Sequence, residues 1–156
     1  MNLFIIALLI FGIAYSAYLP FHTTGMAWME KLYHPTFALP CWLSGLIWPV
    51  MYLLMTVAVW LIWQRRRDQI NKQPYDQALV IFVTQFAVNI LWGPLIVNTQ
   101  NLNLAMMYVY ALFLLAVINT MAFWRVSKLA GLLLIPYVLW TGYFLCIETA
   151  VWRYSV

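Results

Sequence analysis

Two amide side chains lie within a long apolar stretch of the sequence. Gln85 and Asn89 are four residues apart, and Trp92 follows three residues later. On a helix this spacing puts all three residues on one face. If the stretch crosses a membrane, its polar groups are costly and should face protein rather than lipid. The amides then either hold neighbouring helices together or bind a ligand in a pocket. The two roles are compatible, because each amide has several hydrogen-bonding sites.

Large aromatic residues repeat at the same spacing in two other apolar stretches. Trp48 and Tyr52 share one face, and Trp140 shares a face with Phe144. Aromatic residues near the ends of membrane spans usually form an interfacial belt, and that explanation suits Trp60, Trp63, Trp124 and Trp152. Proline or polar neighbours accompany Trp48, Trp92 and Trp140. Because Pro49 and Pro136 can kink or widen a helix, the sequence favours inward-facing aromatic residues that enclose a flat apolar ligand.

Glu148 is the one acidic residue inside an apolar stretch, and it continues the face of Trp140 and Phe144. Because it lies near the end of that stretch, we expect its carboxylate to reach interfacial water. The alternative is a buried carboxylate that serves as a partner for a proton or a cation.

The sequence lacks the motifs of common enzyme and metal sites. His22 and His34 stand twelve residues apart, and Cys41 and Cys146 are far apart, so we expect no metal site. There is no Walker loop, HExxH, GxSxG or dinucleotide fingerprint. The few ionisable groups inside the apolar stretches also argue against an ion-coupled pump.

The composition places these residues in a membrane protein. Of the 156 residues, 66% are hydrophobic and 8% are charged, whereas a soluble domain has about 25% charged residues. Such a chain could not hide its apolar surface from water, so the lipid bilayer is its first partner. The net charge of +4 needs no nucleic acid, since bases beside spans usually set orientation.

Five windows reach the length of about 20 apolar residues that a spanning helix needs. They are residues 2–20, 43–64, 78–97, 103–124 and 129–151. The connection "RRRDQINKQPYDQ" is solvated, and the later connections are short. The sequence therefore predicts an all-α membrane protein in which residues 1–156 form a single bundle of five transmembrane helices.

The basic residues predict the orientation of this bundle. Six of them fall at one end, and Lys31 and Arg153 fall at the other; the six are Arg65, Arg66, Arg67, Lys72, Arg125 and Lys128. The rule that cytoplasmic loops are basic places the N-terminus in the cytoplasm, if the membrane is a bacterial inner membrane.

The segment from Trp28 to Trp42, which we call the first loop, is rich in rigid and aromatic residues. A connection between two helices needs none of these. Its pattern of Trp28, Leu32, Pro35, Phe37 and Pro40 resembles the first loop of the translocator protein family, the tryptophan-rich sensory proteins. "GLIWPVMYLLM", "QFAVNILWGPL" and "FWRVSKLAGLLLIPYVLWTGYF" resemble that family's later motifs, in the same order.

The resemblance implies a five-helix bundle, often a homodimer, that binds tetrapyrroles such as protoporphyrin IX in a pocket under the first loop. No cofactor is implied beyond that ligand. Pro35 and Pro40 would stiffen the loop as a lid. By position, Trp48, Asn89 and Trp140 match pocket residues. The companions that we expect are Trp28, Phe37, Pro40, Tyr52, Gln85, Trp92 and Phe144.

This chain departs from the family pattern at several positions. An acid of the family falls at Tyr108, and the bulky Phe144 replaces a small residue, which should narrow the pocket. An Asn-Tyr pair becomes Glu148-Thr149. The sterol motif is incomplete, so sterol binding is a weak expectation. His34 before Pro35 leaves open a pH-sensitive lid.

Three functions are therefore compatible with the sequence. The first is a membrane receptor or transporter-like binder of porphyrins that acts as a sensor or regulator. The second is light- and oxygen-dependent degradation of protoporphyrin IX, with Trp48 and Trp140 beside the macrocycle as the candidate catalytic residues. The third is a structural or assembly protein whose aromatic residues only pack.

Overall fold

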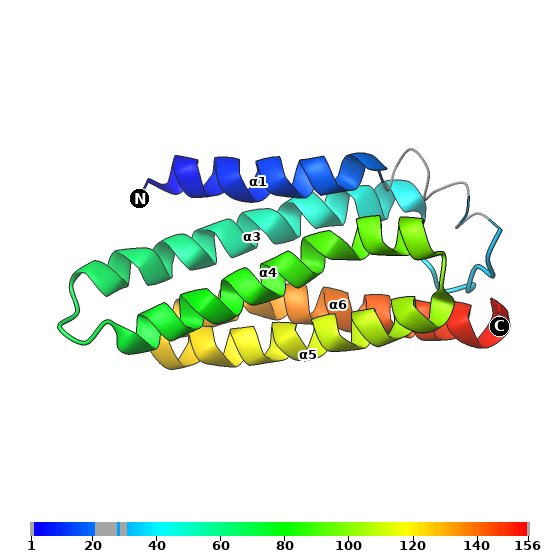
Figure 1. Ribbon diagram of the computed structural model, residues 1–156. Helices are drawn as coiled ribbons and strands as arrows, with labels where there is room; N and C mark the ends of the chain where they lie inside the picture. The colour runs from blue at the N-terminus through cyan, green and yellow to red at the C-terminus, as the bar shows by residue number, and fades with distance from the viewer. Residues whose placement is uncertain (1, 21–27, 29–30, 156) are drawn as a thin grey trace.

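The computed structural model describes residues 2–20, 28 and 31–155, leaving aside the side chains of residues 17–20 and 41. Helices are the only regular elements in that part of the chain. In chain order they are α1 (Leu3–Pro20), α3 (Cys41–Arg67), α4 (Gln73–Thr99), α5 (Leu102–Val126) and α6 (Lys128–Ser155). They lie side by side as one elongated bundle, with α1 against α3 and α4, and with α5 and α6 on the opposite side (Figure 1).

Four of the described helices, α3 to α6, are long and apolar enough to cross a membrane, and α1 is a shorter apolar helix. The five windows predicted from hydropathy therefore correspond to five helices, and the prediction of an all-α membrane protein is confirmed. The helices α3, α4 and α6 have 27, 27 and 28 residues, or about 40 Å at 1.5 Å per residue. Since a hydrocarbon core is about 30 Å thick, their ends project beyond it.

The connection between α3 and α4 is shorter than the sequence predicted. The three arginines Arg65 to Arg67 form the last turn of α3, and α4 already begins at Gln73. Pro74 is tolerated in the first turn of α4, where its missing N–H costs no hydrogen bond. Arg66 also pairs with Asp76 across the connection. Hydropathy indicates only the part of a helix that lies in lipid. It therefore did not predict the polar last turn of α3 and the polar first turn of α4, which continue the hydrogen-bonded helices.

Local sequence signals set the remaining connections. The backbone of Gln100 is left-handed and ends α4, and its N–H bonds to the carbonyl of Ile96. The side chain of Asn101 then caps α5 by accepting from the N–H groups of Asn103 and Leu104. Pro49, Pro94 and Pro136 lie inside their helices without ending them.

Helices α5 and α6 form an antiparallel hairpin joined at Ser127. A Cβ atom on Gly131 would lie 2.7 Å from the Cα atom of Trp124, so only glycine permits the close approach after the turn. Further along, a Cβ on Gly142 would lie 3.2 Å from the Phe113 ring, and Trp152 bonds to Asn103. From one contact to the next, the number of residues is the same along α5 as along α6. The hairpin therefore keeps one register over its length.

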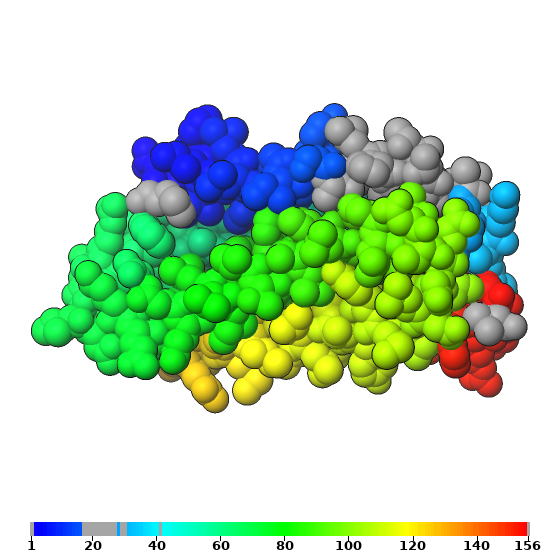
Figure 2. Space-filling model, in the orientation of Figure 1, coloured from blue at the N-terminus to red at the C-terminus, as the bar shows by residue number. Residues whose placement is uncertain are grey.

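The first loop lies over the same end of the bundle as the C-terminus. Figure 2 shows residues 31–40 against the end of α6. The hydroxyl of Tyr143 accepts from the Leu39 N–H at 2.8 Å and donates to the Phe37 carbonyl at 3.1 Å. The Tyr33 N–H donates to Ser155 Oγ at 3.0 Å, and the Tyr33 ring packs on Tyr154. Two points on α6 thus fasten the described part of the loop.

Candidate functional site

A buried polar network joins four helices near the middle of the bundle. Its members are Tyr52 of α3, Gln85 and Asn89 of α4, Asn119 of α5 and Tyr137 of α6. The Tyr137 hydroxyl accepts from Gln85 Nε2 and from Asn89 Nδ2, both at 2.8 Å. Gln85, Asn119 and Tyr137 are each at most 1% exposed. Inside a bilayer no water can hydrogen-bond to these polar groups, so they must bond to one another.

The two amides that the sequence singled out do hold helices together. Asn89 Oδ1 accepts from the Tyr52 hydroxyl at 3.0 Å, and Gln85 Oε1 accepts from Asn119 Nδ2 at 3.1 Å. Asn89 remains close enough to the neighbouring rings to border a ligand site, since its partner Tyr52 stacks on Trp48. The first of the two roles is therefore confirmed, and the second stays a prediction.

A set of aromatic rings lies next to this network, toward the end of the bundle that carries the first loop. We call it the aromatic cluster, and its members are Trp48, Tyr52, Trp92, Trp140 and Phe144. The Trp48 ring centroid lies 5.8 Å from that of Tyr52, 6.1 Å from that of Trp140 and 6.3 Å from that of Phe144. Phe144 also contacts Trp92 edge to face at 5.1 Å. Helices α3, α4 and α6 thus each supply rings to one cluster.

The cluster is apolar but contains an unused hydrogen-bond donor. The indole N–H of Trp140 is buried and has no hydrogen-bond partner among the described residues. Trp140 is 8% exposed. A buried donor without an acceptor costs about 1–3 kcal/mol, and a ligand that supplied an acceptor would recover that cost.

The rest of the predicted site is less closely assembled. Trp28 is half-buried, whereas Phe37 is 52% exposed and Pro40 is also exposed. Phe37 is held by its backbone carbonyl to Tyr143. His34 is exposed, and His22 lies outside the described residues. In this structure none of Trp28, Phe37 and Pro40 is therefore fully buried.

The expectation that Glu148 reaches interfacial water is wrong. Glu148 is 4% exposed, although it lies within two turns of the end of α6. The α5–α6 register continues past Glu148 to the Asn103–Trp152 contact, so α5 still runs beside α6 at this position. Distance from the end of a span could not reveal this burial.

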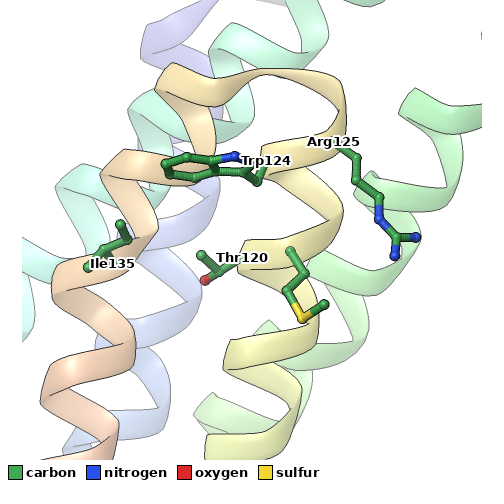
Figure 3. Close-up of a pocket in the computed structure, with 5 residues that line it drawn as sticks. Thr120, Trp124, Arg125 and Ile135 are labelled. Carbon is green, nitrogen blue, oxygen red and sulfur yellow. The ribbon is translucent and has the colours of Figure 1, made fainter.

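Two hollows of the described part of the structure lie at the end of the bundle opposite the first loop. One, of about 290 Å³, is lined by Thr120, Met121, Trp124, Arg125 and Ile135 (Figure 3). The other, of about 570 Å³, lies along the first turns of α4. Met121 and Trp124 are 53% and 42% exposed, so the first hollow is a furrow on the outer surface. Neither hollow includes a residue of the aromatic cluster.

Sequence reasoning missed three residues of this region. Asn119 could have been found, because it is an amide inside an apolar stretch. Tyr137 gave no such signal, since tyrosine is common near span ends. Tyr143 was missed for the same reason, and its bonds to the first loop depend on contacts over more than 100 positions in sequence.

The chain is similar in sequence to known proteins of one family. A family model described as TspO/MBR matches residues 4–153. The chain is 28% identical to Protein CrtK of Rhodobacter capsulatus, over 81% of this chain and 78% of that protein. It is 27% identical to the human translocator protein, over 85% and 77%. It is 28% identical to the tryptophan-rich sensory protein of Cereibacter sphaeroides, over 72% and 67%.

Proposed function

Because the chain belongs to the TspO/MBR family, we propose that it is a membrane receptor for tetrapyrroles such as protoporphyrin IX. The bound state would let it act as a sensor or regulator of tetrapyrrole level. The observation that supports this most is the aromatic cluster with the unpaired indole N–H of Trp140 inside it. Flat rings suit a flat macrocycle, and the indole N–H suits an acceptor on its edge.

Binding on this proposal requires the rings to separate. The Trp48 ring centroid lies 6.1 Å from that of Trp140 and 6.3 Å from that of Phe144, so a macrocycle can enter only if Trp48 moves away from these two rings. Phe144 restricts the side toward Trp92. The polar network below the cluster is tied across four helices and supplies a floor that need not move.

The first loop would close the site from above. Its fastening to Tyr143 and Ser155 leaves the described segment 31–40 in place over the end of α6. Phe37, which is exposed here, would turn toward the macrocycle in the closed state. Pro35 and Pro40 lower the entropy lost on that closure.

A titration tests the proposal. Purified protein is titrated in detergent with protoporphyrin IX in the dark, and tryptophan fluorescence is followed. We expect saturable quenching that weakens in Trp140→Phe and in Asn89→Ala. Trp124→Phe is the matched control, because this indole lies on the outer surface at the other end of the bundle. Quenching that never saturates, or that ignores the first two substitutions, would leave only a packing role for the cluster.

A second candidate function is photo-oxidative degradation of the bound porphyrin. The contact between the Trp48 and Trp140 rings favours it, because a photosensitiser between them would generate reactive oxygen species next to oxidisable indoles. Illumination in the presence of dioxygen then tests it. A bilin-like absorption band that forms under light and is lost when Trp48→Phe and Trp140→Phe are combined would support chemistry.

We also propose that the protein is a homodimer in a bacterial inner membrane, with its N-terminus in the cytoplasm. The N-terminus lies at the same end as the α3–α4 connection (Figure 1), where Arg65, Arg66, Arg67 and Lys72 gather. Protease accessibility of the α3–α4 connection in oriented vesicles tests the orientation, and the mass of the detergent complex tests the dimer.

A further inference from the structure

The furrow on the outer surface of α5 and α6 has a mostly apolar lining and one base. It has a volume of about 290 Å³. The residues that line it are Thr120, Met121, Trp124, Arg125 and Ile135. The Thr120 hydroxyl already donates to the Ala116 carbonyl. Because an apolar hollow does not attract water, an acyl chain of the surrounding lipid is the natural occupant of this furrow in a bilayer.

The furrow runs from the end of the bundle toward its middle. Arg125 belongs to the last turn of α5, and Met121 is one turn further into the helix. Ile135 lies two turns into α6 from its start at Lys128. Tryptophan prefers the membrane–water interface, and arginine reaches for it. The furrow therefore extends from the headgroup level toward the hydrocarbon, as a phospholipid does.

The Trp124 ring forms a firm wall of the furrow. A Cβ atom on Gly131 would lie 2.9 Å from Cε3 of this ring, so the ring rests against the backbone of α6. Figure 3 shows the ring extending toward α6, on the same side as Ile135, and the Arg125 side chain on the other side of α5. Trp124 and Arg125 thus flank the end of the furrow that is nearest the α5–α6 turn.

Both flanking side chains have donors that no protein group uses. Arg125 is exposed, and the Arg66–Asp76 pair is the only ion pair among the described residues. Neither the guanidinium of Arg125 nor the indole N–H of Trp124 forms a hydrogen bond within that part of the chain. Arginine commonly binds phosphate oxygens through two parallel hydrogen bonds, so a phosphate group at this place would find donors without displacing a protein partner.

The charge of this end of the bundle favours an anionic headgroup. Six basic residues lie here against two acidic ones, Asp68 and Asp76, and Asp76 is already paired with Arg66. Basic pockets between spanning helices bind anionic lipid headgroups. Arg125 combines an unpaired charge with a position on an apolar furrow, which are the two features that one phospholipid molecule can use together.

We propose that this furrow is a binding site for one anionic phospholipid. Arg125 and Trp124 hold its phosphate group, and its acyl chain lies along Met121 and Ile135. The site is separate from the proposed tetrapyrrole site, because none of its lining residues belongs to the aromatic cluster. The bound lipid covers the outer side of the α5–α6 hairpin next to its turn.

Two phospholipids with identical acyl chains separate the headgroup charge from the chain. They are phosphatidylglycerol, which is anionic, and phosphatidylcholine, which is zwitterionic. Each is titrated onto the purified protein in detergent, and native mass spectrometry measures the affinity of the first bound lipid. We expect the wild-type protein to prefer phosphatidylglycerol. Arg125→Gln should weaken phosphatidylglycerol about fivefold, the usual contribution of one base at a membrane surface, and should change phosphatidylcholine less than about twofold.

Arg67→Gln is the matched control for charge. It removes the same charge at the same end of the bundle, from an exposed residue of α3 that does not line the furrow. Its affinities for both lipids should stay within about twofold of the wild type. Arg125→Met, which also removes the charge, repeats the test if Arg125→Gln yields no folded protein.

A second pair of variants tests the furrow itself. Met121→Trp places a larger ring in the hollow and should weaken both lipids. Met107→Trp makes the same change at a methionine of α5 that is 72% exposed and lies outside the furrow, and it should bind both lipids as the wild type does.

Each outcome decides for or against the proposal. A preference for phosphatidylglycerol that falls in Arg125→Gln and persists in Arg67→Gln supports it. Equal binding of the two lipids by the wild type, or equal effects of the two arginine substitutions, overturns it. Wild-type affinities in Met121→Trp overturn the place of the acyl chain. Displacement of phosphatidylglycerol by glycerol 3-phosphate, which has no acyl chain, would assign the donors to a free anion and also overturn the lipid site.

Discussion

The hydroxyl group of Tyr137 lies 2.8 Å from Nδ2 of Asn89 and accepts its hydrogen bond in the middle of the bundle. Tyr137 belongs to the last helix and Asn89 to α4, and the same hydroxyl also accepts from Gln85. One oxygen atom thus ties two turns of α4 to α6. The polar network around it forms the floor beneath the aromatic cluster.

Tyr137→Phe should destabilise the protein without a change in packing volume. The substitution leaves two buried amide donors without their acceptor, and interhelical hydrogen bonds in membranes contribute about 1–2 kcal/mol each at most. We expect the free energy of unfolding in mixed detergent to fall by about 1–3 kcal/mol. Tyr110→Phe, at a tyrosine that is 50% exposed, is the control. Equal stability of the two variants would contradict a structural role for the network.

Gly131→Ala should disrupt the α5–α6 hairpin. The new Cβ atom would lie 2.7 Å from the backbone of Trp124, which cannot rotate away as a side chain would. We expect a loss of about 1–3 kcal/mol, the usual cost of overpacking, measured as the change in unfolding midpoint and slope. Gly45→Ala has no atom of the described residues within 4 Å of its new Cβ, apart from its own helix backbone and chain neighbours, and should be neutral. A neutral Gly131→Ala would show that the helices separate at little cost.

Phe144→Ala should widen the ligand site while it lowers stability. The ring fills the space between Trp48 and Trp92, so its removal leaves room for a larger macrocycle. We expect faster association with protoporphyrin IX and a stability loss of about 2–4 kcal/mol, below or near the range for a buried phenylalanine. Stopped-flow quenching measures the rate. Phe4→Ala, at a ring that is 70% exposed, should change neither quantity, and slower association in Phe144→Ala would place the ring outside the ligand's path.

Tyr143→Phe should loosen the first loop. The hydroxyl both accepts from Leu39 and donates to Phe37, and phenylalanine can do neither. Hydrogen exchange followed by mass spectrometry should show faster exchange at the Leu39 amide and in the segment 36–40. The Tyr33 amide, held by Ser155, should exchange at the wild-type rate and so serves as an internal control.

Hydropathy and polar spacing predicted much of this protein. The five apolar windows became five helices, because a bilayer demands continuous helices of a fixed minimum length. Gln85 and Asn89 were recognised as inward-facing, because an amide in lipid must find a polar partner. These conclusions depend on the lipid bilayer around the chain more than on the packing of its helices. The apolar composition of the chain is enough to indicate that bilayer.

The partners of those residues required the tertiary structure. The sequence contains ten tyrosines, and nothing in their local pattern indicates that Tyr137 bonds to Asn89 or that Tyr143 bonds to the first loop. The burial of Glu148 likewise appears only in the tertiary structure. Contacts between helices depend on how each helix is rotated and shifted against its neighbour. The spacing of residues along one helix shows which of them share a face, but it does not show which residues of another helix contact that face.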